Sequence, residues 1–200
     1  MKIGIMGGTF DPIHLGHLAT AEAVRELFAL EEILFIPAAR PPHKLARAVT
    51  DEQHRLAMTI LATNSNRYFK VSDMELKRTG LSYTLDTMNE LHKTFGRSTE
   101  LFFIIGADSL ADLFKWHAAR KLVEKCHFIA TTRQGVDVDF SAVEDFFGEL
   151  AREHIHRVTT PGLEISSTDI REKVKNGHSI KYLVPETVEE YIFREGLYML

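Results

Sequence analysis

Two histidines near the amino terminus, His14 and His17, have the spacing expected of a phosphate-binding site. If a helix begins between His14 and Gly16, both imidazole rings project from one face of its first turn. The free N–H groups and positive dipole end of that helix would face the same space, where imidazole N–H groups can donate to a polyphosphate. Gly7 and Gly8 precede the histidines and allow the backbone to turn sharply and approach a ligand. The segment GGTFDPIHLGH therefore predicts phosphate binding.

The individual parts of this segment also occur in proteins that bind no phosphate. A Gly-Gly pair after a strand is often only a turn, and an isolated H-x-x-H pair more often belongs to the surface or the core. The dinucleotide-binding fingerprint is not met, because G-x-G-x-x-G is absent. A zinc site would have only Asp11 as a third ligand in this segment, and Asp-Pro is equally a turn-forming pair. The combination of glycines, histidines and a helix start favours phosphate binding.

The elements that would position these histidines alternate along the chain. Strand candidates span residues 2–6, 32–37, 68–72, 100–105, 127–131 and 156–159. Helix candidates span about 15–30, 51–62, 84–95, 109–125 with an interruption near Trp116, and 142–152. This alternation predicts an α/β fold: a Rossmann-like, doubly wound, mostly parallel sheet with helices on both faces. Such sheets bind ligands beyond the carboxyl ends of their strands, so the loops after the first and fourth strands are the first candidates.

From about residue 160 the chain is expected to be helical. One helix is predicted at 167–175, and another begins at Pro185 and stops before Gly196. The sequence has no internal repeat, low-complexity segment or linker. Residues 1–200 are therefore predicted to form a single domain, with a C-terminal helical segment at about 160–200.

Hydroxyl side chains mark the starts of three predicted helices. Thr50 with Gln53, and Ser141 with Glu144, have the spacing of a capping box. Ser167 is predicted to cap the helix that begins in the segment ISSTDIR.

ISSTDIR also carries groups that could hold an anion. Ser166, Thr168 and the free N–H groups of the helix start are donors. Arg171 adds a guanidinium fork suited to phosphate. Taken alone, S-x-x-x-R is more often a capped helix with a solvated arginine.

Three further segments carry residues suited to a second substrate. The loop ARPPHK holds Lys44 beside a rigid Pro-Pro pair. Ser82 and Thr84 lie at a predicted helix start, where backbone N–H groups can bind a carboxylate. Trp116, the single tryptophan, follows Gly106 at the end of the fourth predicted strand. An exposed charged loop and a tryptophan used only for packing are the plainer interpretations of these segments.

Composition narrows the classes of function. The formal net charge is −4 and there is no basic run, so a large nucleic-acid footprint is not expected. The single cysteine, Cys126, excludes an internal disulfide framework and is expected to be a buried small hydrophobe. No apolar stretch approaches the roughly 20 residues that span a bilayer, and the start of the chain is too short for a signal peptide. We therefore expect a cytoplasmic protein without membrane partners.

The two phosphate-binding segments resemble a known family. GGTFDPIHLGH is similar to the signature of the nucleotidyltransferase superfamily with the H-x-G-H motif, and GTFDPIHLGHL most closely resembles bacterial nicotinate-mononucleotide adenylyltransferase. ISSTDIR resembles the I-S-S-T-x-I-R motif of the same family. The two motifs occur in family order, about 150 residues apart, and the resemblance extends from Lys2 to about Ile192.

The resemblance implies transfer of AMP from ATP to nicotinic acid mononucleotide. Because the sequence has no dense carboxylate cluster, we expect Mg²⁺ to be carried mainly by the ATP phosphates. It implies four catalytic residues, which are His14, His17, Lys44 and Arg171. The ATP-binding residues that it implies are Gly7, Gly8, Thr9, Phe10, His14, His17, Gly106, Asp108, Arg133, Ser166, Ser167, Thr168 and Arg171. The expected acceptor-binding residues are Lys44, Ser82, Tyr83, Thr84, Trp116 and His117, and the resemblance implies that Tyr83, Thr84 and Trp116 hold the nicotinate ring and carboxylate. RQG at Arg133 departs from the more usual R-P-G, and His117 stands where an aromatic such as tyrosine is common.

Other functions are compatible with parts of this pattern. Phosphopantetheine adenylyltransferase resembles the first loop but has threonine in place of the first histidine, so His14 argues against it. A cytidylyltransferase shares H-x-G-H but has a different late motif. A catalytically silent nucleotide-binding regulator could use the same fold, although it would not need to keep groups that stabilise a transition state. The sequence leaves the oligomeric state open, and a homo-oligomer is compatible with it.

Overall fold

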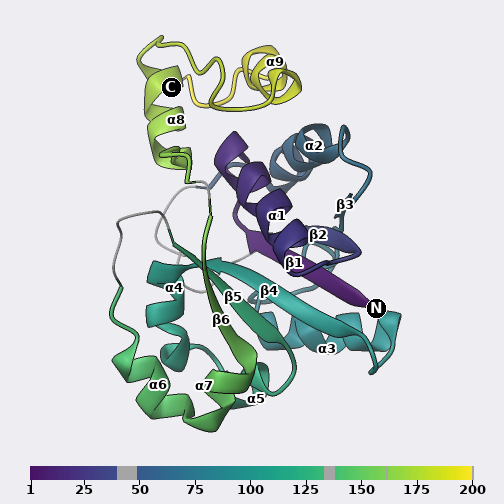
Figure 1. The fold of residues 1–200 in the computed structure, drawn as a ribbon. Coiled ribbons are helices and arrows are strands. Elements are labelled where there is room, and N and C mark those ends of the chain that lie inside the picture. The colour runs from purple at the N-terminus through teal and green to yellow at the C-terminus, as the bar shows by residue number, and fades with distance from the viewer. Residues whose placement is uncertain (40–48, 133–137, 161, 200) are drawn as a thin grey trace.

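The computed structural model describes residues 1–39, 49–132, 138–160 and 162–199. Within them, six parallel strands form one sheet in the order β3-β2-β1-β4-β5-β6 (Figure 1). The strands are β1 (Lys2–Gly8), β2 (Glu32–Pro37), β3 (Phe69–Val71), β4 (Glu100–Gly106), β5 (His127–Thr132) and β6 (Ile155–Thr159). The chain winds outward first to β3 and then to β6, so the strand order reverses between β1 and β4. The predicted doubly wound, parallel sheet is confirmed.

Helices cover both faces of this sheet. One face packs on α3, α5, α6 and α7 through an apolar cluster that includes Ile5, Met88 and Leu122. The other face packs on α1, α2, α8 and α9. Because successive side chains of a strand point to opposite faces, Leu34 joins the first cluster and Phe35 the second. The helices in the described residues are α1 (Leu15–Leu27), α2 (Glu52–Thr63), α3 (Thr84–Phe95), α4 (Ala107–Ala111), the 3₁₀ helix η2 (Leu113–Lys115), α5 (Ala119–Val123), α6 (Ser141–Phe147), α7 (Glu149–His154), α8 (Ser167–Lys175) and α9 (Glu186–Arg194).

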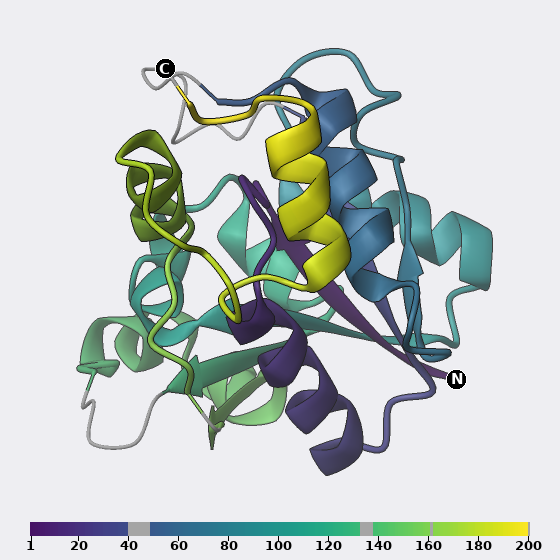
Figure 2. The ribbon, with the colours of Figure 1, turned by 90° about the horizontal axis from the view of Figure 1, so that it is seen from above.

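The C-terminal helices share a core with the sheet. Ile170 of α8 and Val188 of α9 are fully buried in the same cluster as Phe35 of β2. Helix α9 lies beside α2, as Figure 2 shows, and α8 follows β6 on the other side of α1. None of the helices in the described part of the chain has the length and apolar character needed to cross a membrane.

Some helices end or break where the sequence suggested that they continue. Helix α1 ends at Leu27 rather than at residue 30, because Ala29 has a φ of 50° and the N–H of Leu30 bonds back into the helix. The expected helix 109–125 consists of α4, η2 and α5, with the predicted interruption at Trp116. The expected helix 142–152 is divided at Gly148, whose φ of 59° ends α6 before α7 begins.

The cap predicted for α2 is wrong by one residue. The N-cap is Asp51, whose Oδ1 accepts a hydrogen bond from the N–H of Gln53 at 2.9 Å. The backbone of Thr50 is used elsewhere: its N–H donates to Asp11 and its carbonyl accepts from Arg55. Thr50 therefore connects the β1–α1 loop to Arg55 of α2 instead of capping that helix.

The caps predicted for two other helices are also wrong. Ser141 is the first residue of α6 and forms no capping box with Glu144; its N–H donates to Oδ1 of Asp139 at 2.9 Å. Helix α8 is capped by Ser166, whose hydroxyl accepts from a backbone N–H one turn later. Ser167 is thereby left to make a long-range contact. Capping depends on the local backbone angles, which residue spacing alone does not determine.

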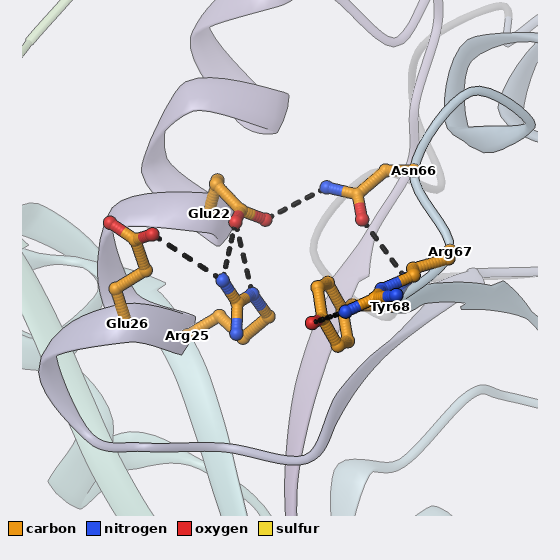
Figure 3. A network of polar contacts seen from close by, with 6 residues as sticks. All are labelled: Glu22, Arg25, Glu26, Asn66, Arg67 and Tyr68. Carbon is orange, nitrogen blue, oxygen red and sulfur yellow. Dashed lines mark hydrogen bonds and ion pairs between the residues drawn. The ribbon is translucent and has the colours of Figure 1, made fainter.

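The second half of α1 is fixed to the segment before β3 by a polar network (Figure 3). Arg25 donates to Oε1 of Glu22 at 2.6 and 3.0 Å, and its guanidinium lies 4.2 Å from the centre of the Tyr68 ring. Asn66 donates to the other oxygen of Glu22 at 2.8 Å. Hydrogen bonding to Arg25 lowers the pKa of Glu22, so the pair stays ionised at neutral pH. This network holds the far end of the helix whose first turn carries the two histidines.

Candidate active site

A cavity of about 880 Å³ opens at the carboxyl ends of β1 and β4, where the strand order reverses. Its walls come from the β1–α1 loop, the start of α1, the starts of α3 and α4, and the start of α8. It brings predicted ATP-binding and acceptor-binding residues into a shared space. The predicted residues that line it are Gly7, Gly8, Thr9, His14, His17, Ser82, Thr84, Gly106, Asp108, Trp116, Ser166 and Ser167.

The other predicted residues lie elsewhere. Lys44 and Arg133 fall outside the described residues. In the described part of the chain, five predicted residues are not in the cavity wall, namely Phe10, Tyr83, His117, Thr168 and Arg171. Phe10 packs on His17, Arg171 donates to the loop backbone and to Thr168, and Tyr83 packs on His117.

The two histidines form a stacked pair at the start of α1. His14 is the N-cap residue, and its backbone N–H donates to Nδ1 of His17 at 3.2 Å. The ring centroids are 3.7 Å apart with an interplanar angle of 25°. Because Nδ1 of His17 accepts a hydrogen bond, a neutral ring carries its proton on Nε2. That tautomer can donate from Nε2 to an anion.

Glycines allow the histidines and their support to fit. A Cβ atom at Gly16 would lie 3.0 Å from Nδ1 of His14, so the glycine lets the His14 ring lie close to the helix backbone. A Cβ atom at Gly8 would lie 2.9 Å from the ring of Phe10. Phe10 itself is buried in the core and contacts the His17 ring edge-on, with centroids 5.3 Å apart. Phe10 therefore supports the His17 ring from the core side.

A buried arginine fixes the loop that precedes the histidines. Arg55 of α2 is only 2% exposed, and its guanidinium donates to the carbonyl oxygens of Thr9 and Ala38 at 2.7 Å each. It also donates to the carbonyl of Thr50 at 2.9 Å. Burial lowers the pKa of Arg55, while the nearby Asp11 carboxylate opposes that shift. The loop of the first motif is thus held against the end of β2.

The second motif meets the first motif in space. The hydroxyl of Ser167 donates to the carbonyl of Pro12 at 2.8 Å. Nη1 of Arg171 donates to the carbonyl of Asp11 at 2.6 Å, and Nη2 donates to Thr168 at 3.2 Å. Ser166 and Ser167 line the cavity, whereas Arg171 donates to the backbone of the first loop. The two motifs, about 150 residues apart in the sequence, therefore lie together in the fold, but Arg171 bonds to the loop backbone and is not in the wall of the cavity that His14 and His17 line.

The opposite end of the cavity is built around the start of α3. Helix α3 begins at Thr84, so its free N–H groups lie close to the lining residues Ser82 and Thr84. Trp116 is half-buried, and its ring lies edge-on to Phe103 with centroids 6.2 Å apart. This contact fixes the indole at the cavity wall. Outside the wall, the rings of the acceptor candidates Tyr83 and His117 pack on each other, with centroids 4.5 Å apart.

A buried carboxyl group supports this end of the cavity. Glu75 is 8% exposed, and Oε1 accepts from the hydroxyl of Thr87 at 2.6 Å. It is also hydrogen-bonded to Ser82, and Arg78 donates to the same Thr87 hydroxyl at 2.8 Å. Burial raises the pKa of Glu75, against the hydrogen bonds from Thr87 and Ser82. Glu75 therefore links the segment before α3 to the first turns of that helix.

Comparison with known proteins identifies the family. The Cytidylyltransferase-like family model matches residues 5–173. The chain is 50% identical over 203 residues to a probable nicotinate-nucleotide adenylyltransferase of Thermoanaerobacter sp. (strain X514), covering 99% of this chain and 94% of that protein. The chain belongs to the nicotinate-nucleotide adenylyltransferase family. A probable nicotinate-nucleotide adenylyltransferase of Moorella thermoacetica is also 50% identical, over 98% of this chain and 91% of that protein.

A solved structure has the same fold as this chain. It is the Plasmodium falciparum nicotinic acid mononucleotide adenylyltransferase complexed with NaAD, with a TM-score of 0.79 and 24% identity. The match covers 98% of this chain and 97% of that chain. At this identity the likeness establishes the Rossmann-like fold.

Asp11, which the sequence offered as a possible metal ligand, uses both carboxylate oxygens in hydrogen bonds in this adenylyltransferase. Its carboxylate accepts from the hydroxyl of Tyr198 at 2.8 Å and from the N–H of Thr50 at 3.3 Å. Among the described residues no group of three or more His, Cys, Asp or Glu side chains could hold a metal ion. The Asp11 carboxylate is therefore an anchor for neighbouring segments.

Sequence reasoning missed several residues of this site. Gly16 was inside the recognised motif, and only the packing of the His14 ring shows why it must be small. Glu75 lies seven residues before Ser82 in a polar stretch where no spacing rule distinguishes a buried acid from a solvated one. Tyr198 is 187 positions from its partner Asp11, so no local pattern connects the two.

Proposed function

We propose that this chain is an adenylyltransferase that moves AMP from ATP to nicotinic acid mononucleotide and releases pyrophosphate. The observation that carries the proposal is the shared cavity, which joins His14 and His17 to the start of α8 at one end and to Trp116 at the other. Relatives that are 50% identical over nearly the whole chain carry the name nicotinate-nucleotide adenylyltransferase, which supports this choice of acceptor.

The proposed reaction is a direct in-line displacement at phosphorus. An oxygen of the acceptor phosphate attacks the α-phosphorus of ATP, and a new P–O bond forms as the bond to the β-phosphate oxygen breaks. The electron pair of that bond leaves with pyrophosphate. A phosphate monoester has its second pKa near 6, so the acceptor is largely a dianion at neutral pH and needs no strong general base. Catalysis then depends on positioning and on stabilising charge.

The phosphate end of the cavity supplies donors for this step. We propose that Nε2–H of His17, the ring of His14 and the positive end of the α1 dipole stabilise the negative charge that grows on the transferred phosphoryl group. Arg171 has five N–H donors, and its bonds to Asp11 and Thr168 use one each. We propose that Arg171 and the start of α8 hold the β- and γ-phosphates. Lys44, outside the described residues, is proposed as a further cation.

The other end of the cavity suits a pyridine carboxylate. The first N–H groups of α3, beside Ser82 and Thr84, can bind the carboxylate of the nicotinate ring. Trp116 offers an indole face to a pyridinium cation, a contact worth about 1–2 kcal/mol. Phe103 holds the indole in place, so the ring need not be ordered when the acceptor binds.

Mg²⁺ is proposed to arrive bound to the ATP phosphates. His14, His17, Ser166 and Ser167 line the phosphate end with imidazoles and hydroxyls. The carboxylates that the described residues place in the cavity wall are Glu75 and Asp108, whereas Mg²⁺ prefers several carboxylate, phosphate and water oxygens together. We propose that Asp11 anchors neighbouring segments, because its carboxylate accepts from Tyr198 and Thr50. When bound, the ion would neutralise phosphate charge.

The test is pyrophosphate release from ATP and Mg²⁺, measured in parallel with nicotinic acid mononucleotide, nicotinamide mononucleotide and phosphopantetheine. We expect the highest kcat/KM with nicotinic acid mononucleotide. Faster release with phosphopantetheine would establish the rival adenylyltransferase activity. Binding of ATP without release for any acceptor would establish a nucleotide-binding regulator.

A further inference from the structure

The short segment between the glycines and the histidines is held by the C-terminal part of the chain. In the part of the chain that the structure describes, at least four hydrogen bonds reach residues 11–15 from residues beyond 160. Ser167 donates to the carbonyl of Pro12, and Arg171 donates to the carbonyl of Asp11. The carbonyl of Leu183 accepts from the N–H of Leu15 at 3.0 Å. The fourth bond joins Tyr198 to the Asp11 carboxylate.

The bond from Tyr198 differs from the other three in its place relative to the cavity. Ser167 lines the cavity, and Arg171 is proposed to contact phosphates, so substitution of either would change binding and positioning together. Tyr198 is not among the residues that line the cavity in the described part of the chain. Its hydroxyl reaches Oδ1 of Asp11 at 2.8 Å, three residues before His14. Its bond to Asp11 therefore connects Tyr198 to the histidines through the loop.

The surroundings of Tyr198 indicate that this contact is specific. Asp11 is 6% exposed, and its second oxygen accepts from the N–H of Thr50. Tyr198 has a φ of 65°, a left-handed backbone conformation that is uncommon for a residue with a side chain. Burial, together with the Asp11 carboxylate, raises the pKa of Tyr198, so its hydroxyl remains a donor at neutral pH.

We propose that Tyr198 is a positioning residue for adenylyl transfer. By holding Asp11, it sets the backbone that leads into the N-cap of α1 and thereby the placement of the His14 and His17 rings. The inference rests on the proposed function, because it assigns the histidines to the transfer step. It also gives the end of the chain a role in the phosphate end of the cavity, about 180 residues away in sequence.

The test is Tyr198→Phe, which removes one hydroxyl and keeps the ring. The matched control is Tyr182→Phe, because Tyr182 is in the same C-terminal part, also has a positive φ, and is 81% exposed. We expect Tyr198→Phe to lower kcat about tenfold, as a small misplacement of catalytic groups does. The KM values for ATP and for the acceptor should stay within about twofold, because the binding groups are unchanged.

A second measurement does not depend on activity. The ring C–H signals of His14 and His17 in the NMR spectrum of the unliganded protein report the stacked pair directly. We expect them to shift in Tyr198→Phe and to match the wild type in Tyr182→Phe. Unchanged kcat and unchanged ring signals in Tyr198→Phe would overturn the inference.

Two further outcomes are decisive. If kcat of Tyr198→Phe falls only in proportion to the unfolded fraction, and recovers at a temperature well below Tm, the residue is structural and the positioning role is wrong. If the wild type releases no pyrophosphate with any acceptor, the proposed function fails. In that case the ring signals still decide whether Tyr198 sets the histidines.

Discussion

Histidines gather at both edges of the sheet, and the two groups differ in what surrounds them. At the carboxyl edge, His14 and His17 stack at the start of α1 and line the 880 Å³ cavity. At the amino edge, the rings of His154 and His156 stack on His127, with centroids 4.8 and 5.3 Å away. A second cavity of about 670 Å³ lies beside this group. Residue type alone does not separate the two edges.

The direction of the helices separates them. In a parallel α/β sheet the helices run back against the strands, so their N-termini gather at the carboxyl edge and their C-termini at the amino edge (Figure 1). The second cavity is accordingly lined by His92 and Lys93 at the end of α3, by Glu124 and Lys125 after α5, and by His154 at the end of α7. Helix C-termini present carbonyl groups and negative partial charge. Helix starts therefore add backbone N–H donors for a phosphate at the carboxyl edge, whereas at the amino edge the donors would be side chains such as Lys93, Arg97 and Lys125.

The largest expected effect tests this contrast directly. Replacing His17 with alanine should lower kcat by about 10²-fold or more, because one donor to the transition state is lost. His154→Ala, at the amino edge, should leave kcat within about twofold. Steady-state pyrophosphate release measures both. Equal kcat values for the two variants would remove the histidine pair from the mechanism and erase the distinction between the edges.

A smaller effect is expected from crowding the carboxyl-edge pair. Gly16→Ala would place a Cβ atom 3.0 Å from Nδ1 of His14 and displace the ring by a few tenths of an ångström. We expect kcat to fall about tenfold. Alanine favours a helix over glycine by up to about 1 kcal/mol, so Tm should stay level or rise. Thermal unfolding beside the activity assay separates the outcomes: a level or higher Tm with normal kcat would show that the ring accommodates the methyl group.

The smallest effect concerns the amino edge and its response to pH. Burial and the neighbouring histidines lower the pKa of His127, and burial also lowers that of His156. Their folded pKa values lie below about 6.5, the value in an unfolded chain, so the unfolded state binds more protons as the pH falls. Their contribution to stability is complete above about 6.5 and is lost as the pH falls through their folded pKa values.

We therefore expect the Tm of the wild type to fall between pH 7 and pH 5, and His127→Gln to flatten that dependence. Replacing His178, an exposed histidine, with glutamine should leave the dependence as it is in the wild type. Thermal unfolding at several pH values measures this. A pH dependence that is identical in His127→Gln and the wild type would show that the amino-edge group does not sense protons.

Local sequence information predicted the elements that local forces determine. The alternation of apolar runs and amphipathic stretches predicted the parallel sheet, and the strand–loop–helix frame placed His14 and His17 correctly at the start of α1. Helix boundaries were less well predicted. The turn at Ala29 and the break at Gly148 depend on single backbone conformations that several residue types can adopt.

The sequence by itself therefore determined the family, the order of the elements and the two motifs that meet at the switch point, because these depend on residue type and short-range periodicity. Only the tertiary structure decided which groups support the motifs. Glu75, Arg55 and Tyr198 act through buried hydrogen bonds to residues distant in sequence. Such bonds form only after the chain has folded around them, because a buried polar group must find its partner wherever packing brings one within reach.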